Sequence, residues 1–359
     1  MRYIGNKTKL LPFLRSALRR LGIPRGTAHD AFAGTASVGR ALKADGWRVS
    51  SSDIMTYSYV MQRAYIVASR VGEFDRLARA DSGVRAALAA HSRPLEAVAA
   101  HLSCGLEPAD GFITRHFAPS GGRMYFTDEN ARRIDAARTA LHAWQSNALI
   151  GDDAFYVLLA AVIEGADRVA NTAGVYAAFI KRWQPNALRP FVAMPLPPVP
   201  SRARCVAHKA DAVEVARALG PIDLLYVDPP YNTRQYAGYY HIPEVIARGW
   251  FNGAVAVRGK TGLIADGEQR SAWCSRRRAP GALRELLAAT GARHVLVSYN
   301  TEGVIPDAEF RAILRGAAVD GRVRRFTRTY KRYRADRDRE GRRYRGDEVK
   351  ELLYYARLR

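Results

Sequence analysis

The hydrophobic pattern divides the chain into two kinds of region. Apolar positions at helical spacing predict helices over 57–71, 83–102, 130–141 and 154–170. No apolar run followed by a carboxylate recurs between 57 and 204. On either side of that region, short apolar runs end in acidic or polar residues, which is typical of parallel strands buried between helices. The pattern predicts an α/β protein with a helical insertion.

The most informative predicted strand covers 224–227. Its Leu-Leu-Tyr-Val run stops at Asp228, where two prolines and Tyr231 follow. Ligands of open α/β sheets bind at the carboxyl ends of the strands, so Asp228 is expected at a binding edge. Pro229 and Pro230 fix φ and remove two N–H donors, which leaves the carbonyls of Asp228 and Pro229 as rigidly placed acceptors. Acceptors for an amino group beside an aromatic face suit an extruded nucleobase.

A second candidate site lies near the amino terminus. Residues 28–42 predict a short strand, a turn of small residues and a helix. Gly34 lets the backbone approach a ligand closely at the start of that helix. A further strand over 47–52 ends at Asp53, about 20 residues beyond the loop, the offset at which a Rossmann-type acid binds ribose hydroxyls. We therefore predict that Asp53 binds the ribose of a cofactor.

Four more strands complete the predicted sheet. The segment 206–210 leads to Asp211, which either caps the next helix or accepts a hydrogen bond from the amine of the cofactor adenine. Residues 294–300 predict another buried strand with a polar end. Residues 323–333 and 349–358 are expected to form a closing hairpin joined by a charged loop.

The charge of the chain points to a polyanionic partner. Lys and Arg number 56 against 34 Asp and Glu, a formal net charge of +22, so binding should weaken steeply with salt. Residues 251–280 are expected to be an exposed basic loop. Cys104, Cys205 and Cys274 form no metal-ligand or disulfide spacing, which favours a reducing cytoplasm. The longest apolar stretch, 154–163, is too short to span a bilayer.

Several motifs together resemble one enzyme family. Asp-Pro-Pro-Tyr at 228–231 resembles the catalytic tetrapeptide of amino-group DNA methyltransferases, which methylate N6 of adenine or N4 of cytosine. Phe-Ala-Gly-Thr-Ala at 32–36 resembles their Phe-x-Gly-x-Gly cofactor loop, with Ala36 at the usual second glycine. Residues 3–7 resemble the amino-terminal segment of Dam-like enzymes, and 233–244 a loop of type IIS restriction–modification methyltransferases. The order of these motifs is similar to that of the α group.

The resemblance implies a Rossmann-like S-adenosylmethionine methyltransferase fold with a mostly parallel seven-stranded sheet. It assigns 1–56 and 205–359 to a catalytic domain and 57–204 to a helical target-recognition insertion. The catalytic candidates are Asp228, Pro229, Pro230 and Tyr231. The cofactor-binding candidates are Tyr3, Asn6, Lys7, Phe32, Gly34, Thr35, Ser37, Asp53, Asp211 and Asp228. The DNA-binding candidates are Arg123, Lys181, Arg182, Arg234, Gln235, Lys331 and Arg332.

The implied reaction is direct methyl transfer from S-adenosylmethionine to N6 of a flipped adenine in double-stranded DNA. Tyr231 would stack on the base while Asp228 and the Pro229 carbonyl accept hydrogen bonds from its amino group. The alternatives are cytosine N4, an RNA substrate, and a non-catalytic DNA-binding or specificity partner. A cognate restriction endonuclease and a monomer or weak dimer stay open. The hypothesis requires the loops at Asp53 and Asp228 to open into one cavity.

Overall fold

The chain forms two compact units. The computed structural model describes residues 2, 5–253, 255–264, 269–331 and 348–359. A sheet unit contains Asn6–Ile54, Ser201–Gln235 and Glu268–Arg359, and a helical unit contains Met1–Gly5, Met55–Pro200 and Tyr236–Gly267. Helices and one large, mostly parallel sheet make the chain an α/β protein, which confirms the predicted fold class.

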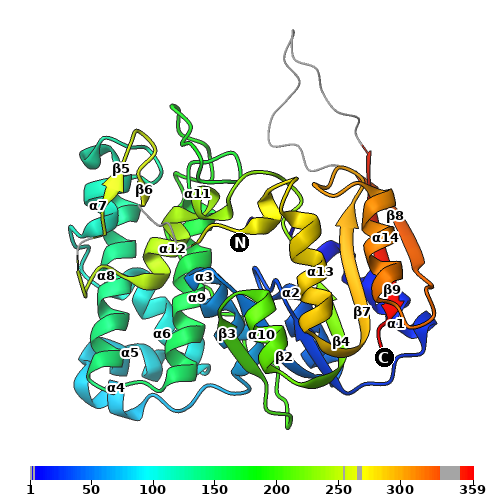
Figure 1. Cartoon of the computed structure of the whole chain (residues 1–359). Coiled ribbons are helices and arrows are strands. Elements are labelled where there is room, and N and C mark those ends of the chain that lie inside the picture. The colour runs from blue at the N-terminus through cyan, green and yellow to red at the C-terminus, as the bar shows by residue number, and fades with distance from the viewer. Residues whose placement is uncertain (1, 3–4, 254, 265–268, 332–347) are drawn as a thin grey trace. The chain divides into compact units, whose positions relative to one another are not determined.

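The sheet has seven strands in the order β3-β2-β1-β4-β7-β9-β8 (Figure 1). The first five of these are parallel, whereas β9 runs antiparallel to both β7 and β8. The strands are β1 (Thr27–Asp30), β2 (Arg48–Asp53), β3 (Val206–Lys209), β4 (Pro221–Val227), β7 (Gly291–Asn300), β8 (Arg324–Lys331) and β9 (Glu348–Arg357). The predicted closing hairpin is thus the β8–β9 pair.

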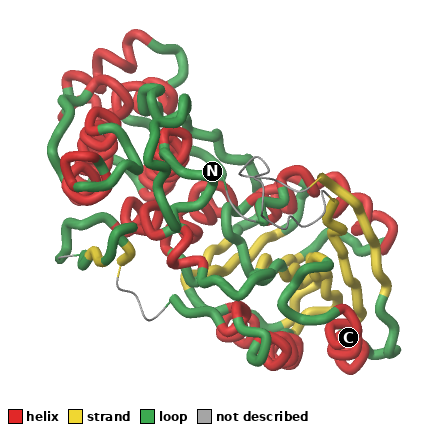
Figure 2. The backbone as a smooth tube through the Cα atoms, turned by 90° about the horizontal axis from the view of Figure 1, so that it is seen from above, coloured by secondary structure: helices red, strands yellow, loops and turns green. Residues whose placement is uncertain are grey.

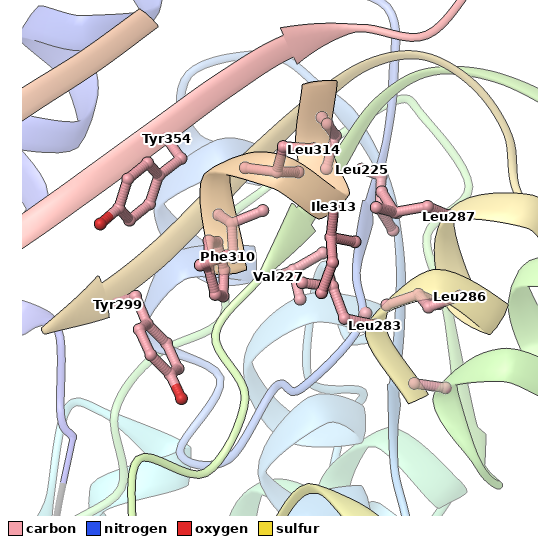
Figure 3. Close-up of a cluster of buried hydrophobic side chains, with 14 of the residues drawn as sticks. Leu225, Val227, Leu283, Leu286, Leu287, Tyr299, Phe310, Ile313, Leu314 and Tyr354 are labelled. Atoms are coloured by element: carbon pink, nitrogen blue, oxygen red, sulfur yellow. The ribbon is translucent and has the colours of Figure 1, made fainter. Parts of the chain in front are cut away.

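Helices lie on both sides of the sheet (Figure 2). They are α1 (Leu11–Leu21), α2 (Ser37–Ala44), α10 (Ala212–Ala218), α13 (Ala279–Ala289) and α14 (Asp307–Ala317), with short turns η1 (Thr8–Leu10) and η5 (Ala272–Cys274). Leu225 and Val227 of β4 pack against Leu283 and Leu286 of α13 and Phe310 of α14 (Figure 3). The intervening residues of β4 point to the opposite face, because side chains alternate along a strand. Both faces of the central strands are therefore buried, as their continuous apolar runs predict.

The strand order reverses between β1 and β4. These two strands are parallel neighbours, with Asp30 opposite Tyr226. The chain continues from β1 to β2 on one side and from β4 to β7 on the other. Such a switch point leaves a crevice outside the carboxyl ends of the two strands. Asp53 at the end of β2 and Asp228 after β4 lie at this same edge, as the hypothesis of one shared cavity requires.

The helical unit is built around two long helices, α8 (Asp128–Ser146) and α9 (Asp152–Val169). Asp135 of α8 accepts hydrogen bonds from the backbone N–H groups of Gly111, Ile113 and Thr114, which fixes the start of helix α7 (Phe112–Phe117). The other elements are α3 (Thr56–Gln62), η2 (Arg63–Val67), α4 (Asp75–Ala80), α5 (Ser82–Ala90), α6 (Pro94–Ala100), η3 (His101–Gly105), α7 (Phe112–Phe117), η4 (Pro119–Gly121), α11 (Tyr236–Tyr239), α12 (His241–Arg248), β5 (Val257–Arg258) and β6 (Leu263–Ile264). Across the ranges that the structure describes, no helix combines the length and apolarity needed to cross a membrane.

Residues 236–267 belong to the helical unit, although the sequence places them in the catalytic domain. The reason is the packing of α12 on α3 and α9. The buried carboxylate of Glu244 accepts hydrogen bonds from the N–H groups of Thr56 and Tyr57 and so caps α3. The expectation of an exposed loop over 251–280 is corrected, because Trp273 is buried in the core of the sheet unit.

Candidate active site

The loop after β1 has a backbone suited to a ligand. Gly34 and Ala36 both adopt left-handed conformations, with φ of 51° and 59°. Ala36 precedes α2 as its amino-terminal cap. Glycine adopts such angles freely, whereas alanine is strained there. The loop therefore keeps a glycine-like turn at the position where the family motif has its second glycine.

The cofactor-binding candidates of this loop converge with the end of β2. The N–H of Gly34 donates a 3.0 Å hydrogen bond to Oδ2 of Asp53. Thr35 is buried and Ser37 begins α2. Phe32 contacts Trp273 edge to face, with 5.0 Å between the ring centroids. The structure thus brings the predicted loop and the predicted ribose acid together within the sheet unit.

Asp30, at the end of β1, is a buried carboxylate that is not among the site residues predicted from the sequence. Its Oδ2 accepts a 3.0 Å hydrogen bond from the N–H of Gly39 in α2. Its Oδ1 is buried and has no hydrogen-bonding partner among the residues that the structure describes. Burial, followed by the charge of Asp228, raises the pKa of Asp30 to about 7. The signal in the sequence is an acidic residue that ends a strand just before the small-residue turn.

Asp228 is held by two neighbours that are distant in sequence. The Lys7 ammonium lies 3.1 Å from its Oδ1, and the Tyr231 hydroxyl donates a hydrogen bond to the same oxygen. Burial raises the pKa of Asp228 to about 6, with Lys7 opposing and Glu351 supporting the rise. Both partners therefore approach the same carboxylate oxygen, Oδ1.

Lys7 bridges Asp228 to a second buried carboxylate, Glu351 of β9. Its ammonium lies 2.9 Å from Oε1 of Glu351, which also accepts a 2.6 Å hydrogen bond from the Ser298 hydroxyl of β7. Burial favours neutral lysine, but the charges of Asp228 and Glu351 outweigh it and raise the pKa of Lys7. Lys7 is therefore an ammonium ion, and its charge is shared between the carboxylates of Asp228 and Glu351.

Tyr231 lies between Lys7 and Tyr299. Its ring meets Tyr299 edge to face, with 5.6 Å between the centroids, and the Lys7 ammonium lies 4.5 Å from its centroid. Lys7 also donates a hydrogen bond to the Tyr231 hydroxyl. Tyr299 is fixed in turn, because its hydroxyl accepts a 2.9 Å hydrogen bond from the N–H of Ile305. Pro229 is buried and Pro230 is half-buried beside this aromatic pair.

Other cofactor candidates have local structural partners. Asp211 accepts a 2.8 Å hydrogen bond from the N–H of Val213 and caps α10, so the helix-cap alternative is observed. Its contact with a cofactor stays a prediction. The Asn6 side chain accepts hydrogen bonds from the N–H and hydroxyl of Thr8. Tyr3 lies outside the described residues.

The DNA-binding candidates of the helical unit differ in their surroundings. The guanidinium of Arg123 donates hydrogen bonds to the carbonyls of His116, Gly259 and Lys260, at 2.8, 2.9 and 3.1 Å. Lys181 and Arg182 are exposed. Arg123 therefore fastens α7 to the turn after β5, whereas the other two present their charges to solvent.

The DNA-binding candidates of the sheet unit also differ in their surroundings. The amide of Gln235 exchanges two hydrogen bonds with the backbone of Ser271, at 2.8 and 3.2 Å. Arg234 is exposed. Lys331 ends β8, and its side chain as well as all of Arg332 lie outside what the structure describes.

Comparisons with known proteins agree with these motifs. A family model described as D12 class N6 adenine-specific DNA methyltransferase matches residues 3–256. Type II methyltransferase M.NlaIII of Neisseria lactamica is 33% identical over 360 residues, 99% of this chain and 98% of that protein. Type II methyltransferase M.FokI of Planomicrobium okeanokoites is 31% identical over 361 residues, 99% of this chain but 52% of its own length. Modification methylase LlaI of Lactococcus lactis subsp. lactis is 33% identical over 336 residues, 93% of this chain and 51% of that protein.

Proposed function

The chain belongs to the D12 class N6 adenine-specific DNA methyltransferases, and from that premise we propose that the cluster around Asp228 is its catalytic centre. The predicted family and the predicted adenine-specific activity are confirmed. The observation that carries the site assignment is the carboxylate of Asp228 at the end of β4, with Lys7 and Tyr231 both on Oδ1. This leaves Oδ2 to accept a hydrogen bond from the amino group of the target adenine.

The loop after β1 fits S-adenosylmethionine, the methyl donor that the family and fold imply. Asp30 presents a buried oxygen without a partner among the described residues, which suits a cationic ligand. The cofactor contributes an electrophilic sulfonium methyl group. Gly34, Thr35 and Ser37 would line its binding site, and Asp53 would accept hydrogen bonds from ribose hydroxyls.

Asp228 and Tyr231 then have distinct tasks. The Asp228 carboxylate accepts a hydrogen bond from the adenine amino group and orients the nitrogen lone pair, a task for which a preorganised buried acceptor is suited. Tyr231 offers a ring for stacking, provided that the base displaces its hydroxyl from Asp228. The Pro229 carbonyl is the proposed second acceptor. The site thus acts by orientation and electrostatics and needs no covalent intermediate with the protein.

The helical unit is proposed to recognise the target DNA. It carries the exposed cations Lys181 and Arg182, which suit contacts with phosphates. The net charge of +22 supports a duplex DNA substrate. A cognate restriction endonuclease and a monomeric or weakly dimeric state stay predictions.

The test is methylation of host DNA by the expressed chain. We expect sequencing that detects modified bases to find one recurring site, and mass spectrometry of nucleosides to find N6-methyladenine. The Asp228→Ala variant should give neither signal while still binding S-adenosylmethionine in a titration. N4-methylcytosine would overturn the base assignment, and full activity of Asp228→Ala would overturn the catalytic centre. Preference for RNA over duplex DNA in competition would overturn the substrate.

A further inference from the structure

Glu351 is a second carboxylate in the cluster that Lys7, Asp228 and Tyr231 form. It lies on β9, opposite Asn300 of β7, and only 1% of its surface is exposed. Its Oε1 receives both the Ser298 hydroxyl and the Lys7 ammonium. Its Oε2 is buried without a hydrogen-bonding partner in the part of the chain that the structure describes.

The charge of Glu351 exceeds what the cluster needs for neutrality. Lys7 and Asp228 already form an ion pair at 3.1 Å. Adding Glu351 places two carboxylates around one ammonium in a buried site, where a surplus charge is destabilising unless it is compensated. A glutamine could accept the Ser298 hydrogen bond equally well. The fold alone therefore gives no reason for an anion at this position.

The distances from the Lys7 ammonium indicate how Glu351 affects Asp228. Lys7 lies slightly nearer to Glu351 than to Asp228, at 2.9 Å against 3.1 Å. The ammonium is thus shared rather than committed to Asp228. A carboxylate whose counter-ion is shared with a second carboxylate is less neutralised by that counter-ion, so its ionised form is more basic and a stronger hydrogen-bond acceptor.

Resting on the catalytic role proposed for Asp228, we propose that Glu351 is a positioning residue for methyl transfer. It draws part of the Lys7 ammonium charge away from Asp228, so that the Asp228 carboxylate stays basic enough to be a strong acceptor for the adenine amino group. Glu351 acts through Lys7 and touches neither the substrate nor the cofactor.

The charges around Asp228 determine whether its pKa rises or falls when Glu351 is neutralised. The titratable groups that act on Asp228 are Lys7 in the amino-terminal segment, Asp30 of β1, Tyr226 of β4, Tyr231 in the following loop and Glu351 of β9. Glu351 raises the pKa of Asp228 and Lys7 lowers it. Neutralising Glu351 gives the full ammonium charge to Asp228. The pKa of Asp228 then falls, and its carboxylate becomes a weaker acceptor.

The experiment measures single-turnover methyl transfer to duplex DNA as a function of pH, at saturating S-adenosylmethionine, for the full-length wild type and Glu351→Gln. Because the carboxylate form of Asp228 is active, the acidic limb of the Glu351→Gln profile should move to lower pH. Its plateau rate should fall by about tenfold, since a less basic acceptor is less effective. Cofactor affinity, measured by titration, should be unchanged. A purely structural role would lower the rate at every pH and leave the limb in place.

Asp223→Asn is the matched control. Asp223 also lies on β4, but it accepts hydrogen bonds from Thr27 at the amino-terminal ends of the strands. Loss of its charge should leave the acidic limb unmoved. The double variant Lys7→Gln/Glu351→Gln should be no slower than Lys7→Gln alone, because residues that act as a unit are not additive.

The outcomes separate the two proposals. An active wild type whose acidic limb does not move in Glu351→Gln overturns the role of Glu351 alone. A wild type without methyl transfer to any adenine overturns the proposed function and this inference with it. If Glu351→Gln does not fold, Glu351→Asp is measured: its carboxylate is withdrawn from Lys7, so a smaller shift in the same direction is expected. A wild-type profile for folded Glu351→Asp would then overturn the inference.

Discussion

The backbone N–H of Gly34 donates a hydrogen bond to Oδ2 of Asp53 at 3.0 Å. This contact joins the loop after β1 to the end of β2, so the two parts of the proposed cofactor site are connected by the protein's own hydrogen bonding. The hydrogen bond therefore fixes Gly34 and Asp53 relative to each other, although the two residues are 19 positions apart in the sequence. A preorganised site of this kind loses less conformational freedom when a ligand enters.

Substitutions of Ala36 test how strictly the backbone of the loop after β1 is constrained. It is fully buried and has a φ of 59°. In Ala36→Gly, relief of left-handed strain is worth about 1 kcal/mol, while loss of a buried methyl group costs about 0.8 kcal/mol. The free energy of unfolding should therefore change little. Ala36→Val should lose about 2 kcal/mol and bind S-adenosylmethionine more weakly, because a β-branched residue adopts this conformation poorly. Urea unfolding and cofactor titration check both, and a Val variant equal to the wild type would contradict the constraint.

Asp30 should make stability depend on pH in a direction unusual for an aspartate. Its pKa is raised to about 7 in the folded chain from 3.8 in the unfolded one. A raised folded-state pKa means that the stability contribution is present at low pH and is lost as the pH rises from about 4 to about 7. Asp30→Asn carries no buried charge at any pH. Its advantage over the wild type should therefore be larger at pH 8 than at pH 5, by about 2–3 kcal/mol.

Urea unfolding of wild type and Asp30→Asn at both pH values gives this difference directly. Comparing the two proteins removes the contributions of the other titratable groups. An advantage of the Asn variant that is the same at pH 5 and pH 8 would show that Asp30 does not titrate between them.

Asp228→Asn separates catalysis from folding. The substitution removes the charge of the proposed acceptor, while Lys7 keeps Glu351 as its counter-ion at 2.9 Å. Stability should therefore change by less than about 1 kcal/mol, since no buried charge is left unpaired. Methyl transfer should fall by about 10²–10³-fold, as when a preorganised electrostatic contact is removed. Transfer of a labelled methyl group to duplex DNA, with thermal unfolding as control, measures both. Wild-type transfer by the folded variant would contradict the assignment, and an unfolded variant would contradict the expected stability.

The strand ends were predictable because their signals are local. The runs that stop at Asp53 and Asp228 show buried strands, and parallel order brings their carboxyl ends to one edge. Asp30 ends a strand of only four residues. Its importance appears only when β1 is seen between β2 and β4, where the charge of Asp228 contributes to raising its pKa.

Glu351 and the position of Lys7 had no local signal. The sequence predicts a strand over 349–358, but nothing in that strand indicates that it adjoins residue 7. Lys7 was predicted to bind the cofactor, and the structure directs its ammonium to Asp228 and Glu351. Basic residues suggested an exposed loop over 251–280, yet Trp273 within it packs against Phe32. The positions of these residues depend on contacts between segments that are distant in the sequence, and hydrophobic periodicity carries no information about such contacts.

Arg123 and Lys181, both predicted to bind DNA, should respond differently to alanine. Arg123→Ala leaves three backbone carbonyls, those of His116, Gly259 and Lys260, without their donor. We expect a loss of about 1–2 kcal/mol in the free energy of unfolding, since hydrogen bonds from charged groups contribute in this range. Lys181 is exposed, so Lys181→Ala should leave stability unchanged.

DNA binding should show the reverse order of effects. If Lys181 contacts a phosphate, Lys181→Ala weakens binding to specific and unrelated duplexes by the same factor and lowers the slope of log affinity against log salt by about 1. Arg123→Ala should keep the wild-type slope, because its guanidinium is already engaged with carbonyls and releases no counter-ion from DNA. Fluorescence anisotropy at several salt concentrations measures both slopes. An unchanged slope for Lys181→Ala together with a reduced slope for Arg123→Ala would mean that Arg123 exchanges its carbonyl contacts for DNA, and the two assignments would have to be reversed.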